Sequence, residues 1–100
     1  MSRTWQFADP RDRAVFTVRE IAHGPQPILH VLHNREDGAW QFLGWETPSV
    51  EDAVVVSLQE IVQLDGSISE LAYLPRGWRA WRKNVCDPWH REPDPNDAEP

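Results

Sequence analysis

Residues 28–45 read Ile-Leu-His-Val-Leu-His-Asn-Arg-Glu-Asp-Gly-Ala-Trp-Gln-Phe-Leu-Gly-Trp, and this stretch decides the fold. Its two ends, 28–33 and 39–45, are rich in the β-branched and aromatic residues that favour strands. Between them lies a polar loop, 34–38, whose Asp37-Gly38 dipeptide supplies the left-handed conformations of a tight turn. The stretch therefore predicts a β-hairpin.

Further strands and short helices are predicted on either side of the hairpin. Residues 14–22 alternate as a half-buried strand, and the glycine and prolines of 23–27 turn the chain so that three strands form an antiparallel meander. Three consecutive valines favour a strand over 53–58 and a short helix over 59–64, although a helical stripe through the whole segment is an alternative. Residues 78–83 predict a last strand.

Two short helical turns are predicted from capping signals. Ser67 and Glu70 have the spacing of a capping box, which predicts a short helix over 68–73. Ser49 and Asp52 are spaced to cap a single helical turn in the connector 46–52.

Together these elements predict an α+β fold, an antiparallel sheet of four to five strands with one or two short helices on one face. Residues 1–91 are expected to form a single domain with an N-terminal arm. Residues 92–100, an acidic proline-rich tail, are expected to be disordered because they have almost no apolar surface to bury. The core candidates are Phe16, Val18, Val31, Trp40, Phe42, Val54, Val56, Ile61, Leu71 and Leu74.

Composition limits the classes of function. The chain has 100 residues and a formal net charge of −6, the wrong sign for binding a nucleic acid polyanion. No apolar run approaches the roughly 20 residues that cross a bilayer, and the first residues lack a secretory signal, so we expect a cytoplasmic protein without membrane contact. Cys86 is the only cysteine, which suits a reducing compartment.

Metal binding and catalysis have candidate residues but no matching pattern. His30 and His33, with Cys86 and His90, are the right ligand types for zinc, but strand alternation places the two strand histidines on opposite faces. We therefore expect no metal and no cofactor. Cys86, Asp87 and His90 could serve as nucleophile, orienting residue and base. A small hydrolase or ligand-binding domain using the Cys86–His90 loop is the alternative function, with no catalytic residue assigned.

Residues 76–83, Arg-Gly-Trp-Arg-Ala-Trp-Arg-Lys, form a basic and aromatic segment in an acidic chain. On a strand, Trp78 and Arg82 share one face, and Arg79, Trp81 and Lys83 lie on the other. Tryptophan beside arginine favours a binding hot spot, although self-packing through cation–π contacts accounts for the same pattern. Acidic loops would steer a basic protein partner toward the surface. The predicted binding residues are Arg79, Trp81, Lys83, Trp45, Glu36 and Asp37.

Several stretches resemble a family of small bacterial proteins of unknown function, a related domain of which is labelled as an immunity protein of polymorphic toxin systems. The resemblance covers about residues 14–91 and rests on structural motifs. It implies a non-enzymatic protein-binding module that neutralises a toxin. The stretches that carry it are 27–31, 37–43 with its Trp-Gln-Phe, 56–61, 67–72, 74–78 with its Leu-Pro-Arg-Gly-Trp, and 80–82.

Overall fold

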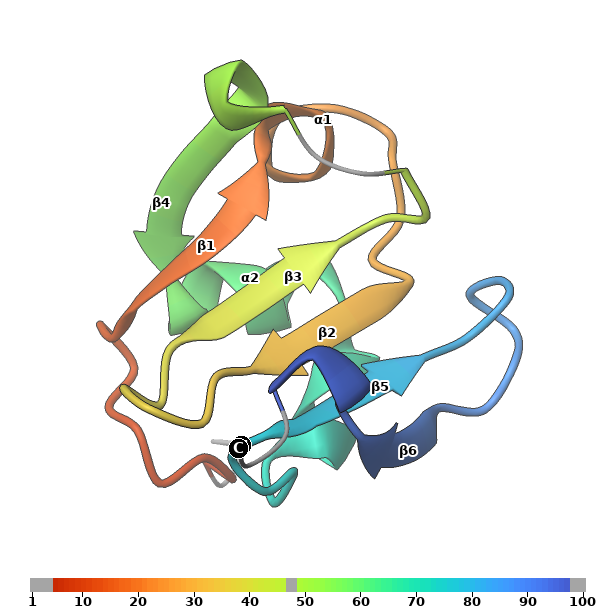
Figure 1. The fold of residues 1–100 in the computed structure, drawn as a ribbon. Coiled ribbons are helices and arrows are strands. Elements are labelled where there is room, and N and C mark those ends of the chain that lie inside the picture. Colours follow the sequence, from red (N-terminus) through yellow and green to blue (C-terminus); the bar gives the residue numbers. More distant parts are fainter. Residues whose placement is uncertain (1–4, 47–48, 98–100) are drawn as a thin grey trace.

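A computed structural model describes residues 5–46 and 49–97 and shows six strands in one mixed sheet, in the order β4-β1-β3-β2-β5-β6 (Figure 1). The α+β class is confirmed, with six strands rather than four to five. Parts of the expected arm, connector and tail, at 1–4, 47–48 and 98–100, lie outside the described residues. The strands are β1 Ala14–Val18, β2 His30–His33, β3 Trp40–Leu43, β4 Ala53–Ser57, β5 Trp78–Trp81 and β6 His90–Pro93.

Short helices connect the strands. The two α-helices are α1 Arg19–Ala22 and α2 Leu58–Leu64, and the three 3₁₀ turns are η1 Val50–Asp52, η2 Gly66–Leu71 and η3 Pro95–Asp97. Helix α2 and turn η2 lie behind the sheet in Figure 1, and η3 lies in front of it, over β2. None of the helices in the described part of the chain is long and apolar enough to cross a membrane.

The expected antiparallel meander is wrong for β1. This strand runs parallel to β3, with Phe16 opposite Gln41, and antiparallel to β4. The strand predicted over 14–22 ends at Val18, because the next four residues turn into α1. That helical turn and the following loop reverse the chain and leave the position beside β1 empty, so β2 runs opposite to β1 and one place further along the sheet. The hairpin then reverses the chain again, and β3 fills the empty position parallel to β1.

The β2–β3 hairpin is confirmed, with Val31 opposite Phe42. Its turn is closed by hydrogen bonds from the Asn34 amide to the Ala39 carbonyl, at 2.8 Å, and from the Ala39 amide to Asp37 Oδ1, at 2.9 Å. Gly38 adopts a φ of +70°, the conformation that the Asp-Gly dipeptide predicts.

The strand-then-helix interpretation of 53–64 is confirmed, with the helix beginning one residue earlier than expected. Ser57 caps α2, because its Oγ accepts a hydrogen bond from the Glu60 amide at 3.1 Å. The turn expected in the connector is present as η1, capped by Ser49. The helix predicted over 68–73 is instead the 3₁₀ turn η2, and Asp65 rather than Ser67 is its capping residue.

The core lies between the sheet and the α2–η2 layer. Among the predicted core residues, Val54 and Val56 are only partly buried, and Phe16 is wrong, being 46% exposed. Val15 and Thr17 face the core in place of Phe16, whereas Val18 is buried as predicted, and the Thr17 hydroxyl donates a 2.7 Å hydrogen bond to the Phe42 carbonyl. This bond removes the penalty of burying a hydroxyl. The fully buried apolar residues include Val15, Val31, Trp40, Phe42, Leu58, Ile61, Ile68 and Leu71.

A buried ion pair fastens the end of β5 to the helical layer. Arg82, only 2% exposed, donates to the carboxylate of Asp65, to the Ile28 carbonyl and to Ser67 Oγ. Its guanidinium lies 4.2 Å from the ring centroid of Trp89. Burial alone would raise the pKa of Asp65, but hydrogen bonds from Ser67 and Arg82 lower it overall.

The predicted disordered tail is wrong for residues 92–97. They complete β6, which pairs with β5, and then form η3. The Asp94 amide donates to the Gly77 carbonyl, and Asp97 Oδ2 accepts from the Arg35 amide, both at 2.8 Å. Backbone hydrogen bonds therefore provide the order that apolar burial cannot.

Candidate functional site

The face of the sheet opposite α2 carries a shallow pocket of about 250 Å³, lined by His30, Trp45, Arg79, Trp81 and Glu92, which we call the indole pocket. Pleating builds it, because the registers of β5 with β2 and with β6 bring the lining residues of these strands to one face. Trp45, which follows β3, closes one side of the pocket. Four separate segments of chain therefore converge on it.

The side chain of Trp81 is held in one orientation. Its Nε1 donates a 2.8 Å hydrogen bond to Glu92 Oε1, and its ring stacks on His90 with centroids 4.4 Å apart and planes 21° apart. The predicted division of β5 is confirmed. Trp78 packs against the core, and Trp81 lies on the outer face with Arg79.

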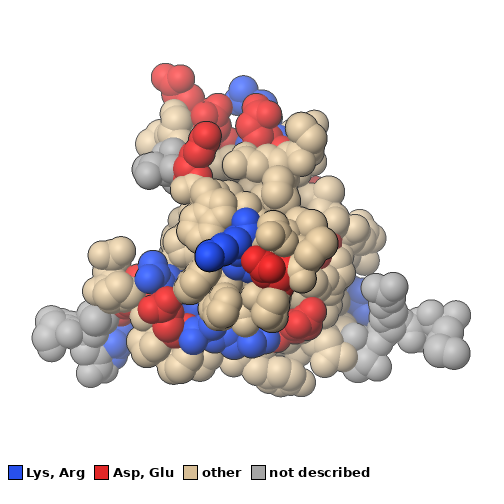
Figure 2. All heavy atoms as spheres, turned by 90° about the vertical axis from the view of Figure 1, so that its right-hand side faces the viewer, with Lys and Arg blue, Asp and Glu red and all other residues tan. Residues whose placement is uncertain are grey.

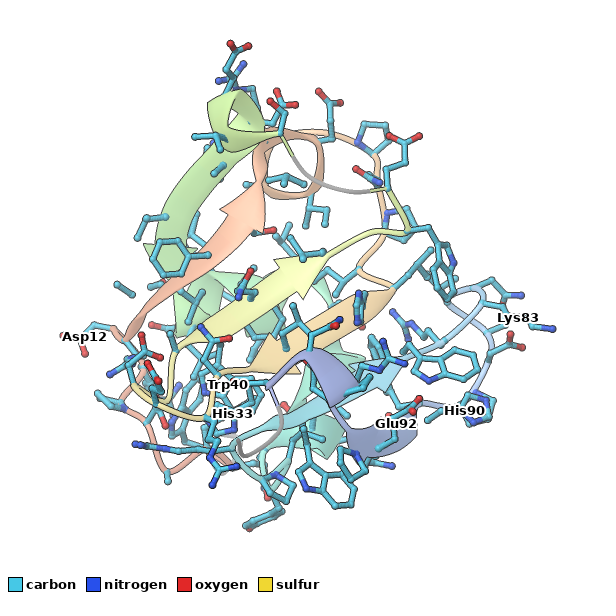
Figure 3. All side chains as sticks on the ribbon, viewed as in Figure 1. Asp12, His33, Trp40, Lys83, His90 and Glu92 are labelled. Carbon is cyan, nitrogen blue, oxygen red and sulfur yellow. The ribbon has the colours of Figure 1, made fainter. Side chains whose placement is uncertain are left out.

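Trp45 is anchored at one end only. Its Nε1 donates to the Lys83 carbonyl at 3.3 Å, yet the residue remains 54% exposed. Its ring is tilted by 56° from that of Trp81, with centroids 6.2 Å apart, so the two indoles form a corner. Lys83 contributes its backbone to this corner, while its side chain is exposed at the same side of the molecule as His90 and Glu92 (Figure 3).

The charges in the indole pocket are internally balanced. Arg79 and Glu92 form an ion pair with Nη2 and Oε1 3.4 Å apart. The hydrogen bond from Trp81 lowers the pKa of Glu92, as does Arg79, against a smaller opposing effect of desolvation. Burial, and then the charge of Arg79, lower the pKa of His30, against the attraction of Asp94. At neutral pH the pocket therefore holds one ion pair and a neutral His30, which suits an apolar or aromatic ligand group.

The structure does not bring Glu36 and Asp37 to this pocket. Both lie in the β2–β3 turn, beyond His33, whereas the indole pocket lies at the other end of the hairpin, beside His30. The carboxylate of Asp37 accepts the hydrogen bond that closes the turn, so this residue stabilises the hairpin.

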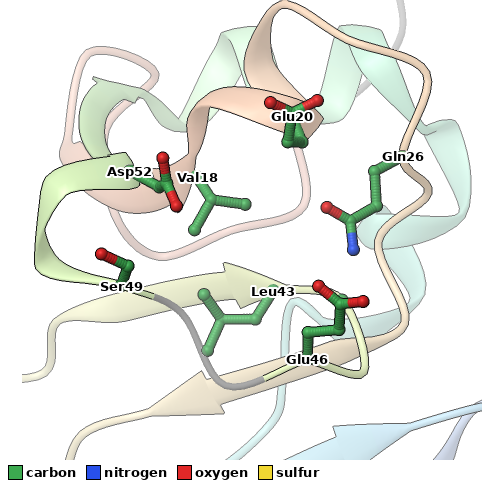
Figure 4. Close-up of a pocket in the computed structure, with 8 residues that line it drawn as sticks. Val18, Glu20, Gln26, Leu43, Glu46, Ser49 and Asp52 are labelled. Carbon is green, nitrogen blue, oxygen red and sulfur yellow. The ribbon is translucent and has the colours of Figure 1, made fainter.

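A second, acidic pocket lies beside the indole pocket and was missed by the sequence analysis. Glu20, Glu46 and Asp52 line this cavity of about 110 Å³ (Figure 4). Acidic side chains gather at the same end of the molecule in Figure 2. The segment 43–46 contributes to both pockets, since Trp45 enters the indole pocket and Glu46 the acidic one. Glu20 comes from α1, and Glu46 and Asp52 come from the two ends of the connector 46–52, so local sequence carries no signal that the three line one pocket.

The Cys86–His90 loop does not form a catalytic constellation among the described residues. The Cys86 amide donates to Asn84 Oδ1 at 2.9 Å, and its thiol is exposed. No hydrogen bond between Cys86 and His90 is found in the described part of the chain, and His90 stacks on Trp81 instead. His30 and His33 lie on opposite sheet faces, and no cluster of three or more metal-ligating side chains is found within 5–46 and 49–97.

No protein-family model, curated protein or solved structure matches this chain.

Proposed function

We propose that this chain is a non-enzymatic protein-binding module that holds its partner with the indole pocket. The observation that carries the proposal is the convergence of Trp45 and Trp81 in one pocket on the sheet face opposite α2, beside Arg79. An exposed indole presents a large apolar surface to water, and tryptophan and arginine are the residues most enriched at binding hot spots. The orientation of Trp81 is fixed in advance, which lowers the entropy lost on binding.

The neighbouring acidic pocket favours a basic partner. Glu20, Glu46 and Asp52 line this pocket, Glu46 directly follows Trp45, and the chain as a whole carries a net charge of −6. This field would attract a cationic protein and orient its basic residues over the acidic end. The partner would then place an apolar or aromatic side chain against Trp45. In keeping with the family resemblance, we propose that the partner is a basic toxin and that the protein acts in the cytoplasm.

The test compares what four immobilised versions of the protein retain from a lysate of the source cells. Wild type and Tyr73→Ala should retain the same basic protein, whereas Trp45→Ala and Trp81→Ala should retain at least about tenfold less of it. Tyr73 is the matched control, because it is an aromatic residue, 81% exposed, that does not line the indole pocket. Quantitative mass spectrometry measures the retained protein.

The retained protein is then purified and its affinity measured at several salt concentrations. Affinity should fall as salt rises, because salt screens the attraction between exposed charges. Glu46→Gln should weaken the salt dependence without abolishing binding. If no protein distinguishes wild type from Trp81→Ala, the proposal is wrong.

A further inference from the structure

Strand β4 is an edge of the sheet without the usual protection. It pairs only with β1, and no described element lies beyond it in Figure 1. Its sequence, Ala-Val-Val-Val-Ser, has no charge and no proline. Natural edge strands usually carry charges, prolines or bulges that block pairing with another chain. The opposite edge, β6, follows that rule, because its sequence is His-Arg-Glu-Pro.

The backbone of Val55 is directed to the free edge. The Leu58 amide donates to the Arg13 carbonyl, and hydrogen-bonded pairs then alternate along the β1–β4 ladder. Val56 and Val54 therefore bond to β1, and the N–H and C=O of Val55 point away from it. The side chain of Val55 is 59% exposed and lies opposite Phe16, itself 46% exposed, on the sheet face opposite α2.

We propose that β4 pairs antiparallel with β4 of a second copy, with the two-fold axis at Val55. The Val55 N–H of each copy donates to the Val55 C=O of the other, and the Ser57 N–H donates to the Ala53 C=O. The two sheets join into one, and Phe16 and Val55 of both copies form a continuous apolar strip across the junction.

A second copy fits this edge because the register is free of like-charge contacts. Pairing about Val55 places Ala53 opposite Ser57, Val54 opposite Val56 and Val55 opposite Val55 of the second copy, so no charged residue lies in the paired segment. The valines therefore meet one another, and the strand is complementary to a second copy of itself in this register.

Charged substitutions of Val55 test this register. Sedimentation equilibrium, up to about 1 mM protein so that a weak interface is populated, measures the association. A reducing agent keeps Cys86 from cross-linking the copies. Wild type should form dimers. Val55→Glu and Val55→Lys should each dimerise at least about tenfold more weakly, since like charges then face each other at the axis. An equimolar mixture of the two variants should recover the dimer.

Matched controls separate the edge from a general surface effect. Val85→Glu and Val85→Lys change a valine that is 56% exposed in the loop after β5, and they should dimerise like wild type. Val55→Pro removes the outward amide without adding a charge and should also block pairing, with circular dichroism confirming that each variant is folded. A monomeric wild type, a dimer indifferent to Val55, or a mixture that stays monomeric would each overturn the proposal.

Discussion

The imidazole of His33 lies almost parallel to the indole of Trp40, with ring centroids 3.8 Å and planes 11° apart. The two residues face each other across the β2–β3 hairpin, and His33 Nδ1 donates a 2.8 Å hydrogen bond to the Leu74 carbonyl. Phe7 packs edge-on against the same indole, with centroids 5.4 Å apart. Trp40 therefore joins the hairpin, the N-terminal arm and the segment after η2 at one point (Figure 3).

Trp40→Ala should destabilise the fold by about 3–5 kcal/mol, the usual range for emptying a buried aromatic site. The residue is only 1% exposed, so its removal leaves a cavity that three segments must close. A domain of this size has a free energy of unfolding of about 5–10 kcal/mol, so this loss removes a large part of its stability. Urea titration followed by circular dichroism measures the loss.

Trp81→Ala should destabilise the fold by less than about 1.5 kcal/mol, because the indole lies on the outer face and its loss opens no core cavity. The variant loses the stacking on His90 and the hydrogen bond to Glu92. The same urea titration compares it with Trp40→Ala. If Trp81→Ala were the more damaging of the two, the indole pocket would be part of the core rather than a binding surface.

Arg82→Met should destabilise the fold by about 3–5 kcal/mol, since it leaves Asp65 and the Ile28 carbonyl without their partner in a buried setting. Arg79→Met is the matched control on the same strand. Its ion pair with Glu92 is partly exposed, so we expect a change below about 1 kcal/mol. Differential scanning calorimetry of both variants checks the contrast, and equal losses would contradict it.

Stability should rise with pH up to about pH 6.5 through His30. The pKa of this residue in the folded protein lies below its ordinary value of 6.5, so the unfolded chain binds more protons as pH falls through this window. His30→Gln should flatten this dependence. The loss of stability at still lower pH should persist, because the pKa values of Asp65 and Glu92 are lowered by folding. Urea midpoints measured around pH 6.5 and at lower pH separate the contribution of His30 from those of Asp65 and Glu92.

Asp97→Ala should destabilise the fold by about 1 kcal/mol, whereas Asp97→Asn should have a smaller effect because the amide oxygen can still accept the hydrogen bond. The bond from the Arg35 amide holds η3 at the start of the β2–β3 turn. Hydrogen exchange of the Arg35 amide reports on it directly. An unchanged exchange rate in Asp97→Ala would show that η3 does not protect this amide.

The elements predicted from sequence are those with a local cause. The β2–β3 hairpin follows from Asp37-Gly38 and the alternation around it, and the outward placement of Trp81 follows from the pleat of β5. These signals lie within a few residues of the structure that they specify.

The elements missed are those that depend on distant partners. Strand β6 has no apolar alternation, and only its pairing with β5 makes it a strand. On β1, Thr17 is buried because its hydroxyl finds a partner in the Phe42 carbonyl, a contact between distant residues that sequence cannot show. The acidic pocket combines Glu20 of α1 with Glu46 and Asp52 of the connector, and these two segments meet only in the folded chain.

The parallel pairing of β1 with β3 has a consequence for the order of folding during synthesis. Of the strands, β1 is made first, and its partners β3 and β4 are both made later. The strand made directly after it, β2, does not pair with it. Closing these loops is slower than closing the β2–β3 hairpin, which needs only a tight turn. We therefore expect the hairpin to form first on the nascent chain and the N-terminal strand to wait, unpaired, until Leu43 has been made.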